Sequence, residues 1–142
     1  MQTGDARHLS RERALEILYE AAMKCVSPTA ALAELAVTPE PFVVELVIDA
    51  EASRATAEAA ITAAAPDWPL ERLAVIDRLI MVLAVGELLG ATPPPDAVVL
   101  DEAVELAKTY STDASPRFVN GVLAAIFPTL RRDAAGAPGS VS

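Results

Sequence analysis

The residues of this chain that could perform nucleophilic or acid–base chemistry are few and widely separated. His8 is the only histidine and Cys25 the only cysteine. A catalytic dyad or triad needs a histidine beside its nucleophile, so it would have to use His8, which we expect to lie in an exposed N-terminal arm. Cys25 falls on the apolar face of an expected helix, where a buried structural thiol is the better interpretation. We therefore expect no catalytic residues and no enzymatic activity.

Metal and cofactor chemistry is equally poorly supported. Acidic residues gather in two short stretches, residues 45–51 and 101–105. Solvated helix faces explain both stretches better than a metal site does. The sequence contains neither a phosphate-binding P-loop nor a glycine-rich dinucleotide fingerprint. We expect no metal ion and no cofactor.

The C-terminal third of the chain holds side chains that suit single-stranded nucleic acid. Tyr110 ends one expected helix and Phe118 begins the next, close to Lys108 and Arg117. Aromatic rings flanked by cations form a platform on which unstacked bases can bind. On this local evidence alone, packing of both rings into the helix corner explains the pattern equally well.

Asn120 and Gly121 lie inside this last, otherwise strong, helix. Glycine in a helix interior costs about 1 kcal/mol relative to alanine, and asparagine is also unfavourable there. The pair predicts a close helix approach at Gly121 and a hydrogen-bonding role for Asn120.

Net charge restricts the kind of nucleic-acid binding that is possible. The 142 residues carry a formal charge of -9, which argues against a general nucleic-acid binder because phosphate contacts need clustered lysine and arginine. The excess acid lies in residues 26–105, however, whereas residues 1–25 are neutral and residues 106–142 weakly basic. We expect a nucleic-acid surface only where the two ends of the chain meet.

Length, cysteine content and hydropathy define the broad class. One domain fits 142 residues, and a single cysteine cannot form an internal disulfide. The N-terminus lacks the apolar core of a signal peptide, and charged residues interrupt the most hydrophobic stretch, residues 70–89. We expect a cytoplasmic protein without a membrane segment.

Abundant alanine and the absence of alternating strand patterns predict an all-α, single-domain bundle of six or seven helices. We expect a flexible N-terminal arm over residues 1–9, the helical domain over residues 10–130 and a disordered tail over residues 131–142. Capping residues and prolines predict the boundaries. The expected helices run from a Ser10 cap to Cys25, from Ser27-Pro28, from Thr38-Pro39 to before Pro66, from Pro69 to an αL end at Gly90, from Asp96 to Tyr110, and from a Ser115-Pro116 cap to Pro128.

The segment DEAVELAKTYSTDASPRFVNGVL resembles the C-terminal signature of the NusB family of transcription antitermination factors. Earlier landmarks of the family appear in order. Arg11-Glu12-x-Ala14-x-x-x-Leu18-Tyr19 resembles its first helix, and Trp68-x-Leu70-x-Arg72-Leu73, Asp77-Arg78 and Glu87-Leu88 resemble its central region. The similarity covers about residues 7–127.

This resemblance implies two small helical subbundles, no enzymatic activity and binding to a short single-stranded element of ribosomal RNA leader transcripts. It also implies a small-subunit ribosomal protein (NusE) as partner within the RNA polymerase antitermination complex. Family members occur as monomers and as dimers, so a homodimer is possible. The positions that match expected RNA contacts are Arg7, Arg11, Tyr19, Lys108, Tyr110, Arg117, Phe118 and Asn120.

Several positions depart from the family pattern. Val82 replaces a usual arginine, Gly86 a common aromatic and Asp101 a usual asparagine, and the N-terminal arm holds fewer arginines. Because each change removes charge or hydrogen-bonding capacity, the alternative function is a NusB-fold protein-interaction module or divergent paralogue with weak or no RNA binding. Exposure of Val82 and Leu83 would favour this alternative. A basic groove between the chain ends would favour RNA, and an acidic groove would argue against it.

Overall fold

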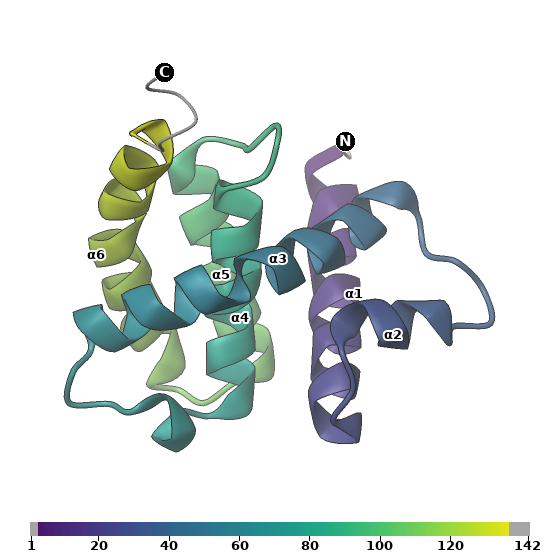
Figure 1. Ribbon diagram of the computed structural model, residues 1–142, viewed down its shortest axis with the longest axis horizontal. Coiled ribbons are helices and arrows are strands. Elements are labelled where there is room, and N and C mark those ends of the chain that lie inside the picture. The colour runs from purple at the N-terminus through teal and green to yellow at the C-terminus, as the bar shows by residue number, and fades with distance from the viewer. Residues whose placement is uncertain (1–2, 137–142) are drawn as a thin grey trace.

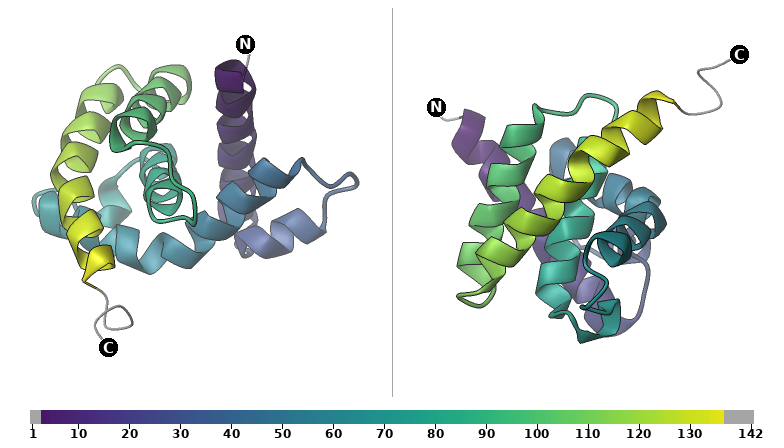
Figure 2. Two further views of the ribbon diagram at one scale, coloured as in Figure 1. Left: turned by 90° about the horizontal axis from the view of Figure 1, so that it is seen from above. Right: turned by 90° about the vertical axis from the view of Figure 1, so that its left-hand side faces the viewer.

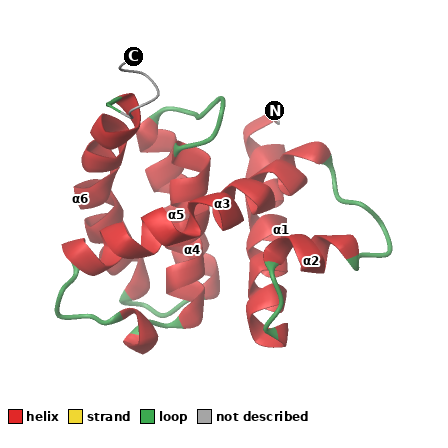
Figure 3. Cartoon of the chain, viewed as in Figure 1, coloured by secondary structure: helices red, strands yellow, loops and turns green. Residues whose placement is uncertain are grey.

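The computed structural model describes residues 3–136, which form six α-helices, one short 3-10 helix and no strand (Figures 1 and 3). The expected all-α class is confirmed. The elements are α1 (Thr3–Lys24), α2 (Pro28–Ala33), α3 (Pro41–Ala64), η1 (Leu70–Arg72), α4 (Val75–Leu88), α5 (Asp96–Tyr110) and α6 (Ser115–Ala135).

The helices form the two expected subbundles, with α3 crossing both. One end of α3 lies beside α1 and α2, and the rest packs against α4 and α6 (Figures 1 and 2). Helix α4 contacts α1, α3, α5 and α6, and every residue from Leu79 to Leu88 is buried. A helix that is apolar on all sides needs such a central position. Val82 and Leu83 are part of this core, so they offer no exposed interface to the alternative function.

Two helices approach closely at Gly86, and not at Gly121 as the sequence predicts. A Cβ atom on Gly86 would lie 2.8 Å from the Cα of Ala50 on α3, so no side chain fits there. This contact explains why the aromatic common in the family is absent. A Cβ on Gly121 would meet no atom within 4 Å. The prediction failed because helix propensity alone does not tell which face of a glycine meets a neighbour.

Two helices extend further than expected. Helix α1 begins at Thr3, so most of the expected flexible arm is helical and Ser10 lies inside the helix, where its hydroxyl donates to the carbonyl of Ala6 and to Glu40. The arm is anchored because His8 pairs with Glu102 of α5, with 2.8 Å between Nδ1 and Oε1. Residues 1 and 2 lie outside the described range.

At the other end, α6 continues through Pro128 to Ala135. Proline removes one helical hydrogen bond without ending the helix. Arg131 holds the last turns by donating to Asp96, with 2.6 Å between Nη2 and Oδ1, and to the carbonyl oxygen of Leu88. The expected tail is therefore helical as far as Ala135, and residues 137–142 lie outside the described range.

The helix caps partly follow the prediction. Ser27 caps α2 by accepting a hydrogen bond from the amide of Ala30, as expected. Helix α3 instead starts at Pro41, with Glu40 at the N-cap position. Gly90 does not adopt a positive φ. The Ser115 hydroxyl caps no helix, because it donates to Asp77.

Cys25 is exposed rather than buried, because it lies just beyond the end of α1 and turns the chain in a left-handed conformation with φ 57°. The amides of Cys25 and Val26 donate back to the carbonyls of Ala22 and Ala21, which is the Schellman pattern of a helix end. Helix α1 ends at Lys24, one residue before Cys25, so the thiol does not lie on its apolar face.

Within residues 3–136, no helix has both the length and the apolar character that crossing a membrane requires. The same part of the chain holds no cluster of three or more histidine, cysteine or acidic side chains placed to bind a metal ion.

Candidate nucleic-acid interface

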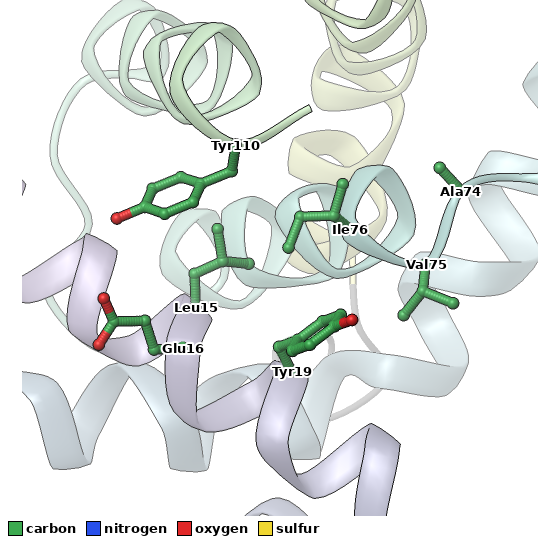
Figure 4. A pocket seen from close by; sticks show the side chains of 7 residues that line it. All are labelled: Leu15, Glu16, Tyr19, Ala74, Val75, Ile76 and Tyr110. Atoms are coloured by element: carbon green, nitrogen blue, oxygen red, sulfur yellow. The ribbon is translucent and has the colours of Figure 1, made fainter. Parts of the chain in front are cut away.

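Two neighbouring pockets, which share Ala74 in their lining, lie where α1, the start of α4 and the α5–α6 corner meet. The larger one, here called the tyrosine pocket, has a volume of about 540 Å³. Tyr19 from α1 and Tyr110 from α5 lie on opposite sides of it, with Leu15 between them in the view of Figure 4 and Ile76 to one side. Its remaining lining residues are Leu15, Glu16, Ala74 and Val75.

The second pocket, here called the tryptophan pocket, has a volume of about 240 Å³. Trp68 and Phe118 meet edge to face in its wall, with ring centres 6.1 Å apart and planes at 70°. Trp68 is 56% exposed, so its ring retains free surface. The other lining residues are Arg72, Leu73, Ala74, Asp77, Thr112, Ala114 and Ser115.

Asp77 fixes the corner that carries Phe118. Its Oδ1 accepts from the hydroxyl of Ser111 at 2.5 Å, and its Oδ2 accepts from the hydroxyl of Ser115 at 2.8 Å. Ser115 also lies 2.9 Å from the hydroxyl of Thr112. These bonds join α4 to the first turn of α6, so they set the position of the Phe118 ring in the pocket.

The two pockets differ in charge. Glu16 lines the tyrosine pocket, and burial, followed by the negative charges of Glu12 and Glu16, raises the pKa of Tyr110 above its usual value. The tryptophan pocket contains one charge of each sign, the exposed Arg72 and the buried Asp77. The groove between the chain ends is therefore neither uniformly basic nor uniformly acidic.

Two cations are free to bind phosphate, namely Arg72 in the lining of the tryptophan pocket and Arg117, the residue before Phe118 on α6. Arg72 and Arg117 form no ion pair or side-chain hydrogen bond with any described residue, and both are exposed. Lys108, two residues before Tyr110, is exposed too but pairs with Glu105 at 3.0 Å. An exposed pair of this kind contributes little to stability, so Lys108 can exchange Glu105 for a phosphate at small cost.

Arg11 does not fit the role that the sequence predicts for it. It is 4% exposed, and its guanidinium pairs with Glu87 through two bonds, Nε–Oε1 at 2.9 Å and Nη2–Oε2 at 2.6 Å. Glu102 accepts a further bond from Nη1 at 3.2 Å. Because a phosphate cannot reach this side chain, we withdraw Arg11 as an RNA contact and assign it the structural task of joining α1 to α4 and α5.

Two other predicted residues lie outside the pockets. The Arg7 guanidinium stacks on the ring of Phe42, 4.2 Å from its centre, and lines a separate cavity of about 60 Å³ together with Glu45 and Asp49. Asn120 is exposed, and it makes no hydrogen bond with the described part of the chain, so its predicted hydrogen-bonding role has no partner among these residues.

The fold thus brings together Tyr19, Tyr110 and Phe118 from the predicted set, and it adds Trp68 and Arg72. The sequence contains a signal for both added residues, because they belong to the Trp-x-Leu-x-Arg landmark. The landmark by itself indicates only the central region, since nothing in the sequence places Trp68 beside α6.

Comparisons of the sequence and of the fold with known proteins lead to the same family. A family model described as NusB family matches residues 8–127. The chain is 46% identical over 125 residues to the transcription antitermination protein NusB of Acidothermus cellulolyticus, covering 85% of this chain and 86% of that protein. The solved structure of T. maritima NusB superposes with a TM-score of 0.76 at 27% identity, covering 86% of this chain and 90% of that one. A chain from a crystal structure described as a plectonemic RNA supercoil superposes with a TM-score of 0.73 at 25% identity, covering 87% and 94%.

Proposed function

The chain belongs to the NusB family of transcription antitermination factors, which are not enzymes, and we propose that it acts by binding a short single-stranded segment of leader RNA across the tyrosine and tryptophan pockets. The RNA-binding function fits the family. The proposal concerns which surface of this chain binds the RNA and how.

The observation that carries the proposal is that four aromatic side chains from distant parts of the sequence line two adjoining pockets. Tyr19 and Tyr110 line one, and Trp68 and Phe118 line the other. Tyr19, Trp68 and Tyr110 are each more than a third exposed, so their rings retain surface that a ligand can cover. Exposed rings of this kind stack on unpaired bases without regard to sequence.

The charges around the two pockets indicate where the bases and where the phosphates of the RNA strand would lie. Phosphates would avoid Glu12 and Glu16 near the tyrosine pocket, so only bases enter there. The backbone then follows Arg72 and Arg117. For single-stranded RNA, each phosphate contact adds about 0.7 to the slope of log affinity against log salt. Two contacts therefore predict a slope of about −1.4 for this part of the surface.

We also propose that the ribosomal protein NusE is the protein partner, within the antitermination complex of RNA polymerase. The family resemblance supports this partner. Leu9 and Met23, both more than half exposed on α1, offer apolar contact area that the fold leaves uncovered. A homodimer would use the same area, and it would compete with NusE for α1. Action on a nascent transcript places the proposed function in the cytoplasm.

The acidic residues near the tyrosine pocket favour the alternative function, which is a protein-interaction module with weak or no RNA binding. Glu12 and Glu16 oppose phosphate at one end of the groove. The buried positions of Val82 and Leu83 remove the other argument for that alternative. RNA binding is the better proposal because Arg72 and Arg117 provide free cations beside the rings.

The test is binding of a 12-nucleotide single-stranded leader RNA at 50 and 200 mM salt, with and without the ribosomal protein. Trp68→Ala and Phe118→Ala should each weaken binding about 5- to 100-fold, which is the stacking energy of one base. Ile48→Ala removes an apolar side chain of α3 that is 45% exposed and lines neither pocket, so it should leave RNA binding unchanged. Equal binding by all four proteins would place the RNA elsewhere, and no binding even with the partner would favour the alternative.

A further inference from the structure

The tryptophan pocket contains a charge that stacking does not require. Asp77 is 8% exposed, yet it belongs to the pocket lining together with Phe118 and Arg72. No lysine, arginine or histidine within residues 3–136 forms an ion pair with it. A buried carboxylate without a cation is costly. Among residues 3–136, the hydroxyls of Ser111 and Ser115 offset this cost, and so does the position of Asp77 in the first turn of α4, where the helix N-terminus favours a negative charge.

The same hydroxyls fix the carboxylate in one orientation. Ser111 holds Oδ1 and Ser115 holds Oδ2, while Ser115 also lies 2.9 Å from the hydroxyls of Ser111 and Thr112. A carboxylate has about four acceptor positions, so two of them remain after both serines are bound. The pocket thus presents a rigid group that can only accept hydrogen bonds.

We propose that Asp77 is a specificity-determining residue, which selects for the tryptophan pocket an RNA base that carries an exocyclic amino group. This inference rests on the proposed RNA function and extends it. Cytosine and adenine present an amino donor on the edge that pairs with other bases, whereas uracil presents a carbonyl oxygen at the corresponding position. That oxygen would face the Asp77 carboxylate without a proton between them.

The geometry of the pocket supports this assignment. Its volume of about 240 Å³ accommodates one base, the Trp68 and Phe118 rings supply apolar wall, and Arg72 lies at the same opening. A base that stacks on the exposed ring of Trp68 turns one edge towards the interior of the pocket, where Asp77 lies. The rings then provide affinity for any base, and the hydrogen bond to Asp77 makes the affinity higher for bases that carry an amino group.

Cytidine and uridine homopolymers give the sharpest test. Both bases are single-ring pyrimidines. At C4, cytosine carries an amino donor where uracil carries a carbonyl oxygen, and the N3–H donor of uracil lies between two carbonyl oxygens that would both approach the Asp77 carboxylate. Fluorescence anisotropy would measure binding of single-stranded rC12, rU12 and the leader 12-mer to the full chain. Wild type should bind rC12 about tenfold more tightly than rU12, the lower part of the range for base discrimination through good hydrogen bonds.

Asp77→Asn should bring the rC12 and rU12 affinities within about twofold, because an amide can either donate or accept. Ser111→Ala keeps the carboxylate but removes one of its two anchors, so it should reduce the preference for rC12 without abolishing it. A purely structural role would weaken both RNAs equally and leave their ratio unchanged. Circular dichroism melting curves would verify that both variants fold.

Each outcome has a definite meaning. Equal binding of rC12 and rU12 by wild type, a preference that survives in Asp77→Asn, or binding of the leader RNA but of neither homopolymer would overturn the role of Asp77. Failure to bind all three RNAs would instead overturn the proposed RNA function itself.

Discussion

Replacing Arg11 by alanine separates the structural role assigned here from an RNA-binding role. The substitution would leave Glu87 about 6% exposed and without its bidentate partner, in the centre of the contact between α1 and α4. Removing one member of a buried ion pair costs about 3–5 kcal/mol. For a chain of this size, 1 kcal/mol shifts the melting temperature by about 3 °C, which predicts a decrease of roughly 10–15 °C.

Differential scanning calorimetry or thermal circular dichroism would measure this decrease. Arg13→Ala is the matched control, since Arg13 is on the same helix but its pair with Glu16 is exposed and should contribute little. The double variant Arg11→Met, Glu87→Leu should recover most of the lost stability, because it removes both charges and keeps the volume. An Arg11→Ala protein that melts with wild type but binds RNA poorly would refute the reasoning and restore Arg11 as a phosphate contact.

Three further substitutions test the packing and the charge network. Gly86→Ala should destabilise the protein by about 1–3 kcal/mol in urea titrations, because the added Cβ meets the backbone of Ala50 at 2.8 Å; wild-type stability would show that α3 and α4 separate easily. Gly121→Ala should instead stabilise it by up to about 1 kcal/mol, and a loss of stability would mean that the residue has a neighbour after all. His8→Gln should destabilise most at acid pH. The hydrogen bond to Glu102, followed by the charges of Glu102 and Glu12, raises the His8 pKa above 6.5 despite partial burial, so its contribution is complete below pH 6.5 and disappears as pH rises through the folded-state pKa. A wild-type-minus-variant difference that grows with pH would contradict this sign.

The helical class and most boundaries follow from the sequence because local signals set them. Ser27-Pro28 caps α2, and α5 runs from Asp96 to Tyr110 as its flanking prolines and apolar period predict. Helix ends that depend on distant partners could not be predicted. The first turns of α1 are held through His8 and Glu102, and the last turns of α6 through Arg131 and Asp96, which are 94 and 35 residues apart in the chain.

Part of the candidate site can be predicted from the sequence, because some of its residues are close together in the chain. Tyr110 and Phe118 are close in the chain, so their proximity could be predicted. The meeting of Trp68 with Phe118 depends on the position of η1 beside α6, and the burial of Arg11 depends on Glu87 of α4. A single sequence gives the type of these side chains but not their tertiary partners.

The emission of Trp68 tests the central claim most directly, because it is the only tryptophan in the chain and lies in the proposed interface. Titration with the leader 12-mer should quench its fluorescence to saturation, with a midpoint that rises with salt concentration and matches the affinity measured by filter binding. Tight binding on filters without any change in Trp68 emission would contradict the account and place the RNA on another face of the protein.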